Sequence, residues 1–246
     1  MNNELNFSKD DLMKLRDNLY SMYSEVGKAL AHPVRLIILD LLLQSKSLTV
    51  EDITLEASIP LVSVSQHLQV LKRSGLVNSD RQGTYVYYTL ASDEIYQLLN
   101  IIKKTSEKTK NEITQTVDTY FSYRNKMDEI SLEELCEKLK TDSILLIDLR
   151  KPREYENGHI DKSISIPYKS LHEEFPEILD RHFPEINKDK QVAVYCRGNY
   201  CICSDIAVKE LQKRGIKALR LNAGYPEWKV LQPKPCAYHS KAKIQK

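Results

Sequence analysis

The sequence predicts two domains of different class: a mainly α domain that carries a β hairpin, followed by an α/β domain with a parallel sheet. Three observations lead to this prediction. The chain has 246 residues, a length at which two domains of ordinary size are expected. In the first half, apolar residues recur at helical spacing. In the second half, strand-like runs alternate with helical segments, the usual pattern of a parallel sheet.

Composition excludes several classes of protein. With 41% hydrophobic and 28% charged residues, the chain is typical of a globular protein. The opening stretch MNNELNFSKDD has no apolar segment behind a basic one, and no run approaches the ~18 apolar residues of a membrane span. We therefore expect a cytoplasmic protein without membrane contact. An odd number of cysteines, five, favours a reducing compartment and reactive thiols over structural disulfides.

The first half contains the elements of a helix-turn-helix followed by a wing. A first helix carries apolar residues at spacings of three and four between Leu12 and Val26, and Ser8 with Asp11 can cap its start. Pro33 stands near the beginning of a second helix. The other expected elements are a short helix over 50–57, a turn at 58–60, a helix over 61–75 closed by Gly75, two strands within 76–90 and a long helical stretch over 95–121.

The helix after the turn has an apolar and a polar face. Val64, Leu68 and Leu71 follow helical spacing and are expected to face the core. The polar face carries short or amide-bearing side chains, which can reach base edges in the major groove of DNA. These candidate base-contacting residues are Ser63, Ser65, Gln66, His67 and Gln69.

Basic residues around this helix supply candidate contacts to the DNA backbone. Lys72 and Arg73 at the helix end could meet phosphates. Arg81 and Thr84 at the tip of the wing could touch the backbone or the minor groove. The alternative is a winged helix used for protein contacts, whose polar face is merely solvated.

The first half resembles the ArsR/SmtB family of bacterial repressors. Three motifs carry the resemblance, ALAHPVRL, SQHLQVLKRSGLV and RQGTYVYY, within about residues 20–100. The resemblance implies DNA binding by a homodimer whose interface is formed by the first and last helices. It also implies a roughly palindromic operator with half-sites about one helical turn apart. Because the first 125 residues are nearly neutral, DNA binding would depend on the local placement of charge.

This half departs from the metal sensors of the resembled family. Those carry a cysteine pair on the helix before the turn, or His and Asp ligands on the terminal helix. Here VEDITLEAS contains neither Cys nor His, and residues 92–124 contain neither. No metal site is therefore expected in this half.

A polar, non-periodic stretch, YRNKMDEI, separates the two halves. We place the DNA-binding and dimerisation domain at 1–124, a linker at 125–130, the second domain at 131–234 and a basic tail at 235–246. The second domain starts with a capping box, Ser131 with Glu134. Its strands are expected in SILLIDL, SISIP, VAVYC and IKALRL, and its helices in PREYENG, LHEEFPEILDRHF and SDIAVKELQKRG, the last capped by Ser204.

Three of the five cysteines follow the strand VAVY, in a loop that leads into a helix: Cys196, Cys201 and Cys203. Ligand sites of α/β folds lie at this end of the strands. Loop amides and the helix dipole form a cradle for anions there, and the same field lowers the pKa of a thiol at Cys196. Arg197 adds positive charge, and Gly198 permits a tight backbone path.

Three interpretations of this loop compete. Cys196 can be a reactive nucleophile, the thiols can be buried and inert, or the three cysteines can bind zinc. The spacing C-x4-C-x-C is unusual for zinc and has no obvious fourth ligand, so no metal is expected.

The second half resembles the rhodanese (sulfurtransferase) family over about residues 130–232. The motifs are LIDLRKPREYENGHIDKSISIP, then VYCRG, then NAGYPEW. The resemblance implies a rhodanese-like domain in which Cys196 accepts sulfur from a small donor, such as thiosulfate or polysulfide, as a covalent persulfide and without another cofactor. The residues implied to cradle that sulfur through their amides are Arg197, Gly198, Asn199, Tyr200 and Cys201. Residues implied to be mainly structural are Asp148, Arg150, Glu154, Gly158 and His159.

The loop departs from the common rhodanese pattern, C-x-x-G-x-R. The stretch CRGNYCICS is two residues longer and lacks the terminal Arg, and Ala223 replaces the first of two usual glycines. A longer loop could admit a polysulfide or an arsenic oxyanion. Cys201 or Cys203 could attack a Cys196 persulfide or sulfenic acid and form a disulfide. No motif surrounds the remaining cysteines, Cys136 and Cys236.

The leading hypothesis is a transcriptional regulator, expected to be a repressor, whose rhodanese domain senses or carries reactive sulfur at Cys196. One alternative is a sulfurtransferase that uses the winged helix for dimerisation or docking. Another is a regulator that responds to an arsenic oxyanion.

Overall fold

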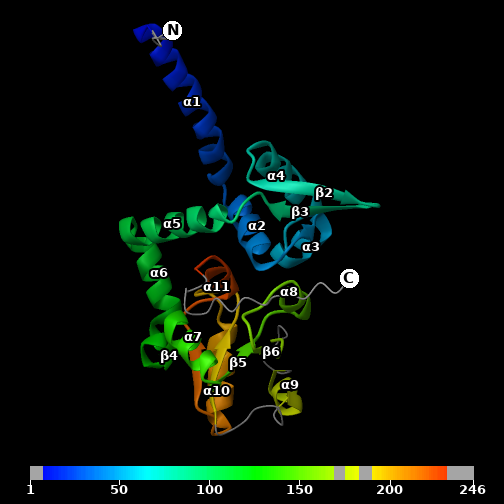
Figure 1. Ribbon diagram of the computed structural model, residues 1–246, viewed down its shortest axis with the longest axis vertical. Coiled ribbons are helices and arrows are strands. Elements are labelled where there is room, and N and C mark those ends of the chain that lie inside the picture. Colours follow the sequence, from blue (N-terminus) through cyan, green and yellow to red (C-terminus); the bar gives the residue numbers. More distant parts are fainter. Residues whose placement is uncertain (1–7, 169–174, 183–189, 232–246) are drawn as a thin grey trace, which may run out of the picture. The chain divides into compact units, whose positions relative to one another are not determined.

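The computed structural model describes residues 8–168, 175–182 and 190–231 (Figure 1). The chain divides into two compact units, Met1–Leu99 and Asn100–Lys246. The stretch 125–130, expected as a linker, falls inside the second unit. Among the described residues, no helix is both long and apolar enough to cross a membrane.

The first unit is built on four helices that lie where the sequence predicts them. Ser8 caps the first helix, because its hydroxyl accepts a hydrogen bond from the amide of Asp11 at 3.1 Å. Thr49 caps the third helix in the same way, with Asp52 as its partner. The bounds are α1 Lys9–Leu30, α2 Pro33–Gln44, α3 Val50–Ala57 and α4 Leu61–Arg73.

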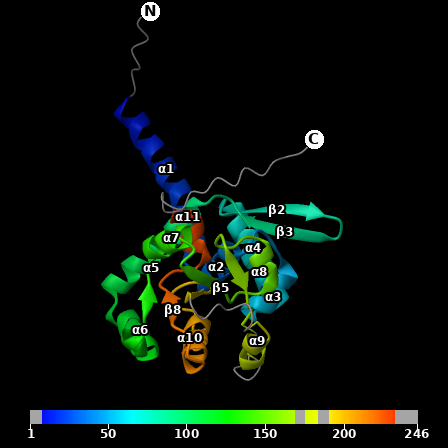
Figure 2. The same ribbon diagram turned by 60° about the horizontal axis from the view of Figure 1, so that its bottom comes forward.

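A three-stranded antiparallel sheet completes the winged helix. Strands β2 (Val77–Gln82) and β3 (Tyr85–Leu90) form the long hairpin seen in Figures 1 and 2, and the short β1 (Leu48–Thr49) pairs with β3. Gly83 lies in the hairpin turn with a φ of 62°, a conformation that favours glycine. The core of the unit joins residues from α2, α3, α4, the hairpin and the start of the next helix.

The long helical stretch expected over 95–121 is two helices. Helix α5 spans Glu94–Thr109 and α6 spans Asn111–Phe121, and between them Lys110 has extended backbone angles. The Thr114 hydroxyl donates to the Glu107 carbonyl at 3.0 Å, which satisfies an acceptor freed at the end of α5. Thr and Asn are weak helix formers, which explains why the break falls at this place. A 3-10 turn, η1 (Ser122–Lys126), follows α6.

The α/β part of the second unit has a five-stranded parallel sheet of order β4-β8-β7-β5-β6. The capping box predicted at Ser131 is present, with the Ser131 hydroxyl accepting from the amide of Glu134. The strands are β4 Glu129–Ile130, β5 Ile144–Asp148, β6 Ser163–Ser165, β7 Gln191–Tyr195 and β8 Ala218–Leu221. The helices are α7 Leu132–Lys140, α8 Pro152–Glu156, α9 Phe175–His182, α10 Cys203–Lys213 and α11 Tyr225–Leu231.

Helices cover both faces of this sheet. On β7, Val192 and Val194 join the core formed with α9 and α10, whereas Ala193 and Tyr195 join the core formed with α7 and α11. Both faces of the central strand are therefore buried, as in most parallel sheets. The C-terminal end of β7 opens directly into the segment that carries the three cysteines.

Cys136 is buried on α7 and disulfide-bonded. The expectation that reactive thiols replace structural disulfides therefore does not extend to this residue. Cys236 lies outside the described residues.

Candidate functional site

Helix α4, which we call the recognition helix, has the two faces predicted from its sequence. Val64, Leu68 and Leu71 are completely buried in the core of the first unit. The opposite face presents exposed polar side chains to solvent. Those predicted DNA contacts that are exposed are Gln66, Gln69, Lys72 and Arg73 on the helix and Arg81 and Thr84 on the hairpin.

The other predicted base-contacting residues are partly buried: Ser63, Ser65 and His67. The His67 ring packs against the His32 ring with 4.3 Å between centroids. Burial lowers the pKa of His67, and the nearby charges of His32 and Arg35 lower it further. His67 therefore belongs to a packed histidine pair at the edge of the helix rather than to a freely solvated face.

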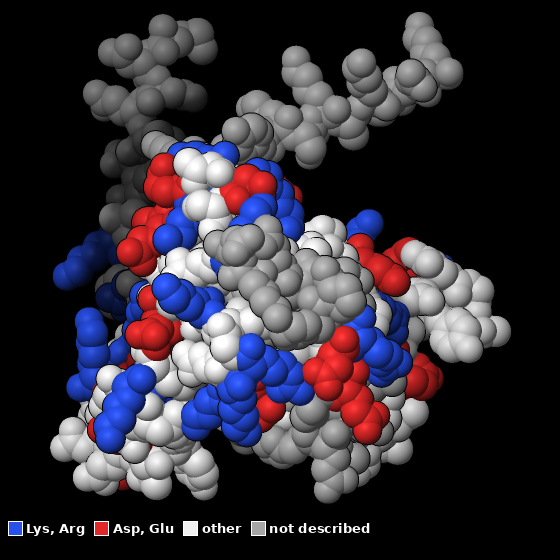
Figure 3. All heavy atoms as spheres, turned by 90° about the horizontal axis from the view of Figure 1, so that it is seen from below, with Lys and Arg blue, Asp and Glu red and all other residues white. Residues whose placement is uncertain are grey.

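Charge is not concentrated by sign on the face of the molecule shown in Figure 3, where basic side chains are interspersed with acidic ones. Basic groups near the recognition helix come from its last turn, Lys72 and Arg73, and from the hairpin tip, where Arg81 donates to the Gly83 carbonyl at 3.3 Å. This placement suits contacts to phosphates on either side of a helix inserted in a groove.

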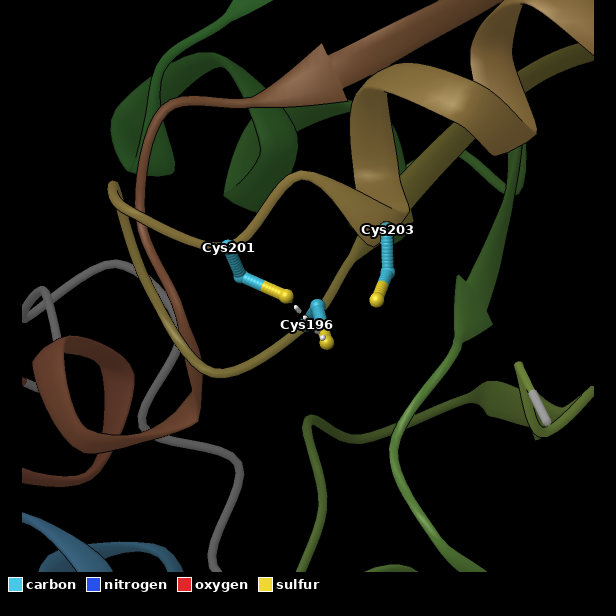
Figure 4. A group of neighbouring side chains, drawn as sticks. All are labelled: Cys196, Cys201 and Cys203. Atoms are coloured by element: carbon cyan, nitrogen blue, oxygen red, sulfur yellow. Dashed lines mark hydrogen bonds between the residues drawn. The ribbon is translucent and has the colours of Figure 1, made fainter. Parts of the chain in front are cut away.

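The three cysteines lie in residues 196–203, which we call the cysteine loop (Figure 4). Cys196 directly follows β7, and Cys203 is the first residue of α10. The expectation that Ser204 caps this helix is wrong, because the helix starts two residues earlier, with Ile202 at the cap position and no side-chain cap. Ser204 is instead buried in the first turn.

The three sulfur atoms converge. All three Sγ atoms lie within 4.8 Å of one another, and those of Cys196 and Cys201 are 3.0 Å apart and hydrogen-bonded. Cys196 is 5% exposed, whereas Cys201 and Cys203 are partly exposed. A disulfide bond is ~2.05 Å long. Joining Cys196 to Cys201 therefore requires the two sulfur atoms to approach by only about 1 Å.

Within the cluster, the pKa of Cys201 is lowered, whereas that of Cys196, which was expected to be lowered, is raised. Hydrogen bonds with the Cys196 and Cys203 thiols and with the backbone at Cys203 and Arg197 lower the pKa of Cys201 to about 2. Hydrogen bonds with the other two thiols and burial raise the pKa of Cys196. For Cys203, the hydrogen bond with Cys196 lowers the pKa, but the bond with Cys201 and burial outweigh it and raise the pKa to about 12.

Arg197 holds the start of the loop against α8. Its guanidinium donates to both carboxylate oxygens of the buried Glu154, at 3.0 and 2.8 Å. Its charge is therefore largely neutralised by Glu154, and Arg197 positions the loop more than it attracts anions. Gly198 follows with a φ of 130°, a conformation that few other residues adopt.

Gly224 lets a second segment pass close to the loop. A Cβ atom at Gly224 would lie 2.5 Å from the Gly198 nitrogen and 2.7 Å from the Arg197 carbonyl carbon, too near for any side chain. The amide of Gly224 donates to the Glu227 carboxylate at 2.9 Å. The glycine of the NAGYPEW motif is thus required by a backbone contact with the cysteine loop.

The other side of the loop is held by Arg124 from η1, which sequence analysis did not single out. Arg124 donates to the carbonyl oxygen of Cys201 at 3.1 Å and to that of Asn199. It also forms an ion pair with Asp205 of α10, with a shortest N–O distance of 2.7 Å. Arg220 of β8 donates to the same Asn199 carbonyl at 3.1 Å and pairs with Asp205 at 3.0 Å.

Aromatic contacts extend this connection to α5 and α6. Tyr123 donates to Asp205 at 2.5 Å, and the Arg124 guanidinium lies 3.9 Å from the centre of the Phe121 ring. The Tyr200 ring packs against Phe121, and its hydroxyl donates to the Glu107 carboxylate. Burial and this carboxylate raise the pKa of Tyr200 to about 12, so its hydroxyl stays protonated. No local sequence pattern signals these contacts, because they join residues about 80 positions apart.

Behind the loop lies a fully buried ion pair between Asp148 and Arg150, 2.7 Å apart. Tyr195, the residue before Cys196, donates to Asp148 at 2.5 Å and accepts from the amide of Ile160 at 3.0 Å. Arg150 also donates to the Gly158 carbonyl at 2.7 Å. These contacts fix the end of β7 and hence the position of Cys196.

The fold and these two sites define a class of protein. It is a two-domain transcriptional regulator in which an ArsR-type winged helix-turn-helix precedes a rhodanese domain. Family models match both parts, a helix-turn-helix domain over residues 30–80 and a rhodanese-like domain over residues 131–231. The predicted fold class and both family resemblances are thereby confirmed.

Similarity to known proteins shows to which family the chain belongs. The HTH-type transcriptional regulator Rv0324 of Mycobacterium tuberculosis is 32% identical over 212 residues, which are 86% of this chain and 89% of that protein. The chain therefore belongs to this family of HTH-type transcriptional regulators. Transcriptional repressor SdpR of Bacillus subtilis is 36% identical over 85 residues, 33% of this chain and 93% of its own.

A solved structure is similar to the first part of the chain. It is the homodimeric winged helix-turn-helix DNA-binding domain, fragment 1–100, of a possible ArsR-family transcriptional regulator from Mycobacterium bovis. It is 36% identical, covers 39% of this chain and 87% of its own, and has a TM-score of 0.36.

Proposed function

We propose that this regulator is a homodimeric, DNA-binding repressor that senses reactive sulfur through its cysteine loop. The observation that carries the proposal is the 3.0 Å separation of the Cys196 and Cys201 sulfur atoms beside a third thiol. Such a cluster can store a persulfide and then close to a disulfide with little movement of the chain.

The first chemical step is the formation of a Cys196 thiolate. The pKa of Cys201 is lowered and that of Cys196 is raised, so a Cys196 thiolate forms when its proton passes to Cys201, whose sulfur lies 3.0 Å away. This thiolate attacks the outer sulfur of thiosulfate or of a polysulfide. The S–S bond of the donor breaks, and sulfite or a shorter polysulfide leaves with the electron pair.

The second step uses Cys201 as the resolving thiol. Its sulfur attacks the inner sulfur of the Cys196 persulfide, and a disulfide between Cys196 and Cys201 forms. The outer sulfur leaves as hydrosulfide and takes the proton that Cys201 had received. The protein is oxidised by two electrons and the transferred sulfur is reduced, so no further oxidant is needed.

Arg124 connects this chemistry to the winged helix along the chain. It donates hydrogen bonds to the Cys201 and Asn199 carbonyls and forms an ion pair with Asp205. It belongs to η1, which directly follows α6. A disulfide that draws Cys201 toward Cys196 displaces the carbonyl that Arg124 holds. Sulfur chemistry at the loop thereby changes the free energy of the segment that leads back to the DNA-binding domain, as allosteric coupling requires.

Three observations support DNA binding by a homodimer. The recognition helix presents exposed amides and two basic residues, and the homologous Mycobacterium bovis domain is described as homodimeric and DNA-binding. Helix α1 also exposes large apolar side chains at helical spacing, which a second copy would bury: Leu12 is 52% exposed, Leu15 53%, Leu19 38% and Met22 63%.

Fluorescence anisotropy of the reduced chain on DNA from upstream of its own gene tests the proposal. Tight binding that is lost after polysulfide treatment and restored by a thiol reductant is expected. Cys196→Ser and Cys201→Ser should bind DNA without responding, whereas Cys203→Ser, the matched control, should still respond. Arg124→Gln should form the disulfide, detected by mass spectrometry, and yet stay on the DNA. A normal response by Cys196→Ser would overturn the mechanism.

The enzyme hypothesis makes a different prediction in the same experiments. A sulfurtransferase that uses the winged helix only for docking shows many turnovers of thiosulfate with cyanide as acceptor and no specific DNA affinity. A sensor reacts once for each loop. Steady-state turnover together with a failure to bind DNA would favour the enzyme.

A further inference from the structure

The cysteine loop has a geometry that suits a second kind of ligand. The Sγ atoms of Cys196, Cys201 and Cys203 all lie within 4.8 Å of one another. In the part of the chain that the structure describes, no other set of three or more His, Cys, Asp or Glu side chains converges in this way. Sequence spacing favoured no metal site here, but the folded loop brings the three sulfur atoms together.

We propose that these three thiols bind one soft ion that accepts three sulfur ligands, the class to which monovalent copper and trivalent arsenic belong. The type of ligand atom determines which class of ion can bind. Thiolates select soft ions, whereas magnesium and calcium require oxygen ligands. The converging set consists of sulfur alone.

The number of ligands argues against zinc. Structural zinc sites are closed by four protein ligands, usually in a tetrahedral arrangement. Among the described side chains, no His, Asp, Glu or further Cys joins the three sulfur atoms. Arg197, the nearest charged residue in the loop sequence, is held by Glu154 and has no lone pair to offer. An ion that is satisfied by three ligands fits this set better than one that needs four.

The three donors are held in place before any ion arrives. Cys196 is fixed at the end of β7 and Cys203 at the start of α10. Between them, the amide of Cys201 donates to the Gly198 carbonyl at 3.1 Å, and the carbonyl of Cys201 accepts from Arg124 at 3.1 Å. Binding therefore orders few additional groups, which favours affinity.

The charge balance also distinguishes between the candidate ions. The three converging donors are thiols, which bind an ion as thiolates. A trivalent ion leaves the three-thiolate complex neutral, whereas a monovalent ion leaves it negative. Burying net charge is costly, so the charge balance favours the trivalent ion.

The binding step needs no oxidant or reductant. Trivalent arsenic enters as arsenous acid, whose three As–O bonds break while three As–S bonds form. Three water molecules leave, and they carry away the three thiol protons. Monovalent copper binds by displacing thiol protons to water. No sulfur atom is oxidised in either case.

The proposal does not depend on the sulfur response, although the two ligands would compete for the same thiols. The test uses the full-length reduced chain under anaerobic conditions. Copper(I), arsenite and zinc(II) are titrated separately against a competing chelator or dithiol, and X-ray absorption spectroscopy counts the ligand atoms. We expect one ion per chain with three sulfur neighbours, and tighter binding of arsenite or copper(I) than of zinc(II).

Variants assign the ligands. Cys203→Ser, which alters a partly exposed residue, should weaken binding at least tenfold and leave two sulfur neighbours, and Cys201→Ser should do the same. Ile202→Ala, in the same loop and 48% exposed, is the control and should bind like the parent chain. Circular dichroism confirms that each variant is folded.

Each outcome either supports or overturns the three-sulfur site. Three-sulfur binding of arsenite, of copper(I) or of both supports the site, and the tighter ion identifies its occupant. Binding of neither ion overturns the proposal, and so does zinc(II) binding with a fourth ligand. A failure to bind either ion does not bear on the polysulfide response, because that response is measured separately on DNA.

Discussion

The recognition helix and the cysteine loop are both short segments that carry a candidate ligand site, but they acquire their shape in different ways. The functional face of α4 follows from helical periodicity within 13 residues. The cysteine loop is held by residues far away in the sequence, such as Arg124, which lies 77 positions before Cys201. A site on a helix face can therefore be altered one residue at a time, whereas the loop depends on contacts from several elements.

The comparison predicts that the largest losses come from residues behind the loop. Asp148→Ala removes the carboxylate that pairs with the fully buried guanidinium of Arg150. We expect ~3–5 kcal/mol lower stability of the second unit, as for other broken buried ion pairs. Urea unfolding, followed by fluorescence of the single Trp228, measures it.

The control for this change is an exposed ion pair of the same unit. Lys190→Ala removes the partner of Asp142, whose side chain is 74% exposed. Exposed pairs contribute little, so this variant should unfold like the parent chain. Equal losses in the two variants would contradict the assigned role of the buried pair.

A smaller loss is expected where the loop touches a neighbouring backbone. Gly224→Ala places a Cβ 2.5 Å from the Gly198 nitrogen, so the loop must shift. We expect ~1–3 kcal/mol of destabilisation from the overpacking, together with slower disulfide formation between Cys196 and Cys201. Thermal unfolding and mass spectrometry after polysulfide treatment measure the two effects.

Gly83→Ala in the hairpin is the matched control for that strain. Its φ is 62°, but no atom lies within 4 Å of the added Cβ. It should cost about 1 kcal/mol from backbone conformation alone and leave disulfide formation unchanged. If Gly83→Ala slowed disulfide formation as much as Gly224→Ala, the contact between Gly224 and the loop would not be the cause.

On the recognition helix, the expected effect is local. Gln69→Ala removes an exposed amide that can pair with a base edge, and such pairs contribute ~1–3 kcal/mol of discrimination. We expect about tenfold weaker binding to the operator by fluorescence anisotropy. Stability and the rate of disulfide formation should stay at the parent values. A change in loop chemistry would show that the two sites do not behave as the comparison states.

The smallest effect concerns pH. Burial and the charges of His32 and Arg35 lower the pKa of His67 below the ordinary 6.5, so the folded protein favours the neutral ring. The unfolded chain then binds more protons, and stability falls as the pH drops below about 6.5 toward the lowered value. Melting temperatures at pH 7.5 and 5.0 measure this slope. His67→Gln should flatten it, and an unchanged slope would assign it to other groups.

Local patterns predicted the fold well. Short-range signals such as the caps at Ser8 and Ser131 and the buried stripe of Val64, Leu68 and Leu71 act within a few residues, and the structure has all of them. The expected cap at Ser204 is wrong because the helix begins at Cys203, so that Ser204 lies in its first turn. The break at Lys110 was missed because apolar spacing continues on both sides of it.

The chemistry of the loop could be predicted only in part. The sequence placed three cysteines together after a buried strand, and the structure brings their sulfur atoms together. It did not indicate that the pKa of Cys201 is lowered, because that shift depends on the hydrogen bonds that the other two thiols and the backbone make with Cys201 after folding. Nor did it single out Arg124, Arg220 and Asp205, whose contacts are made by side chains from η1, β8 and α10.

The proximity of the Cys196 and Cys201 sulfur atoms, 3.0 Å apart, has a consequence for timing. A loop that closes on itself can react once and must then be reopened by a cellular thiol before it reacts again. The delay before the regulator recovers would depend on the supply of that thiol and on how readily it reaches the half-covered sulfur of Cys201. The regulator would therefore stay in its disulfide state after the reactive sulfur has gone. The supply of reducing thiol would determine how long that state lasts.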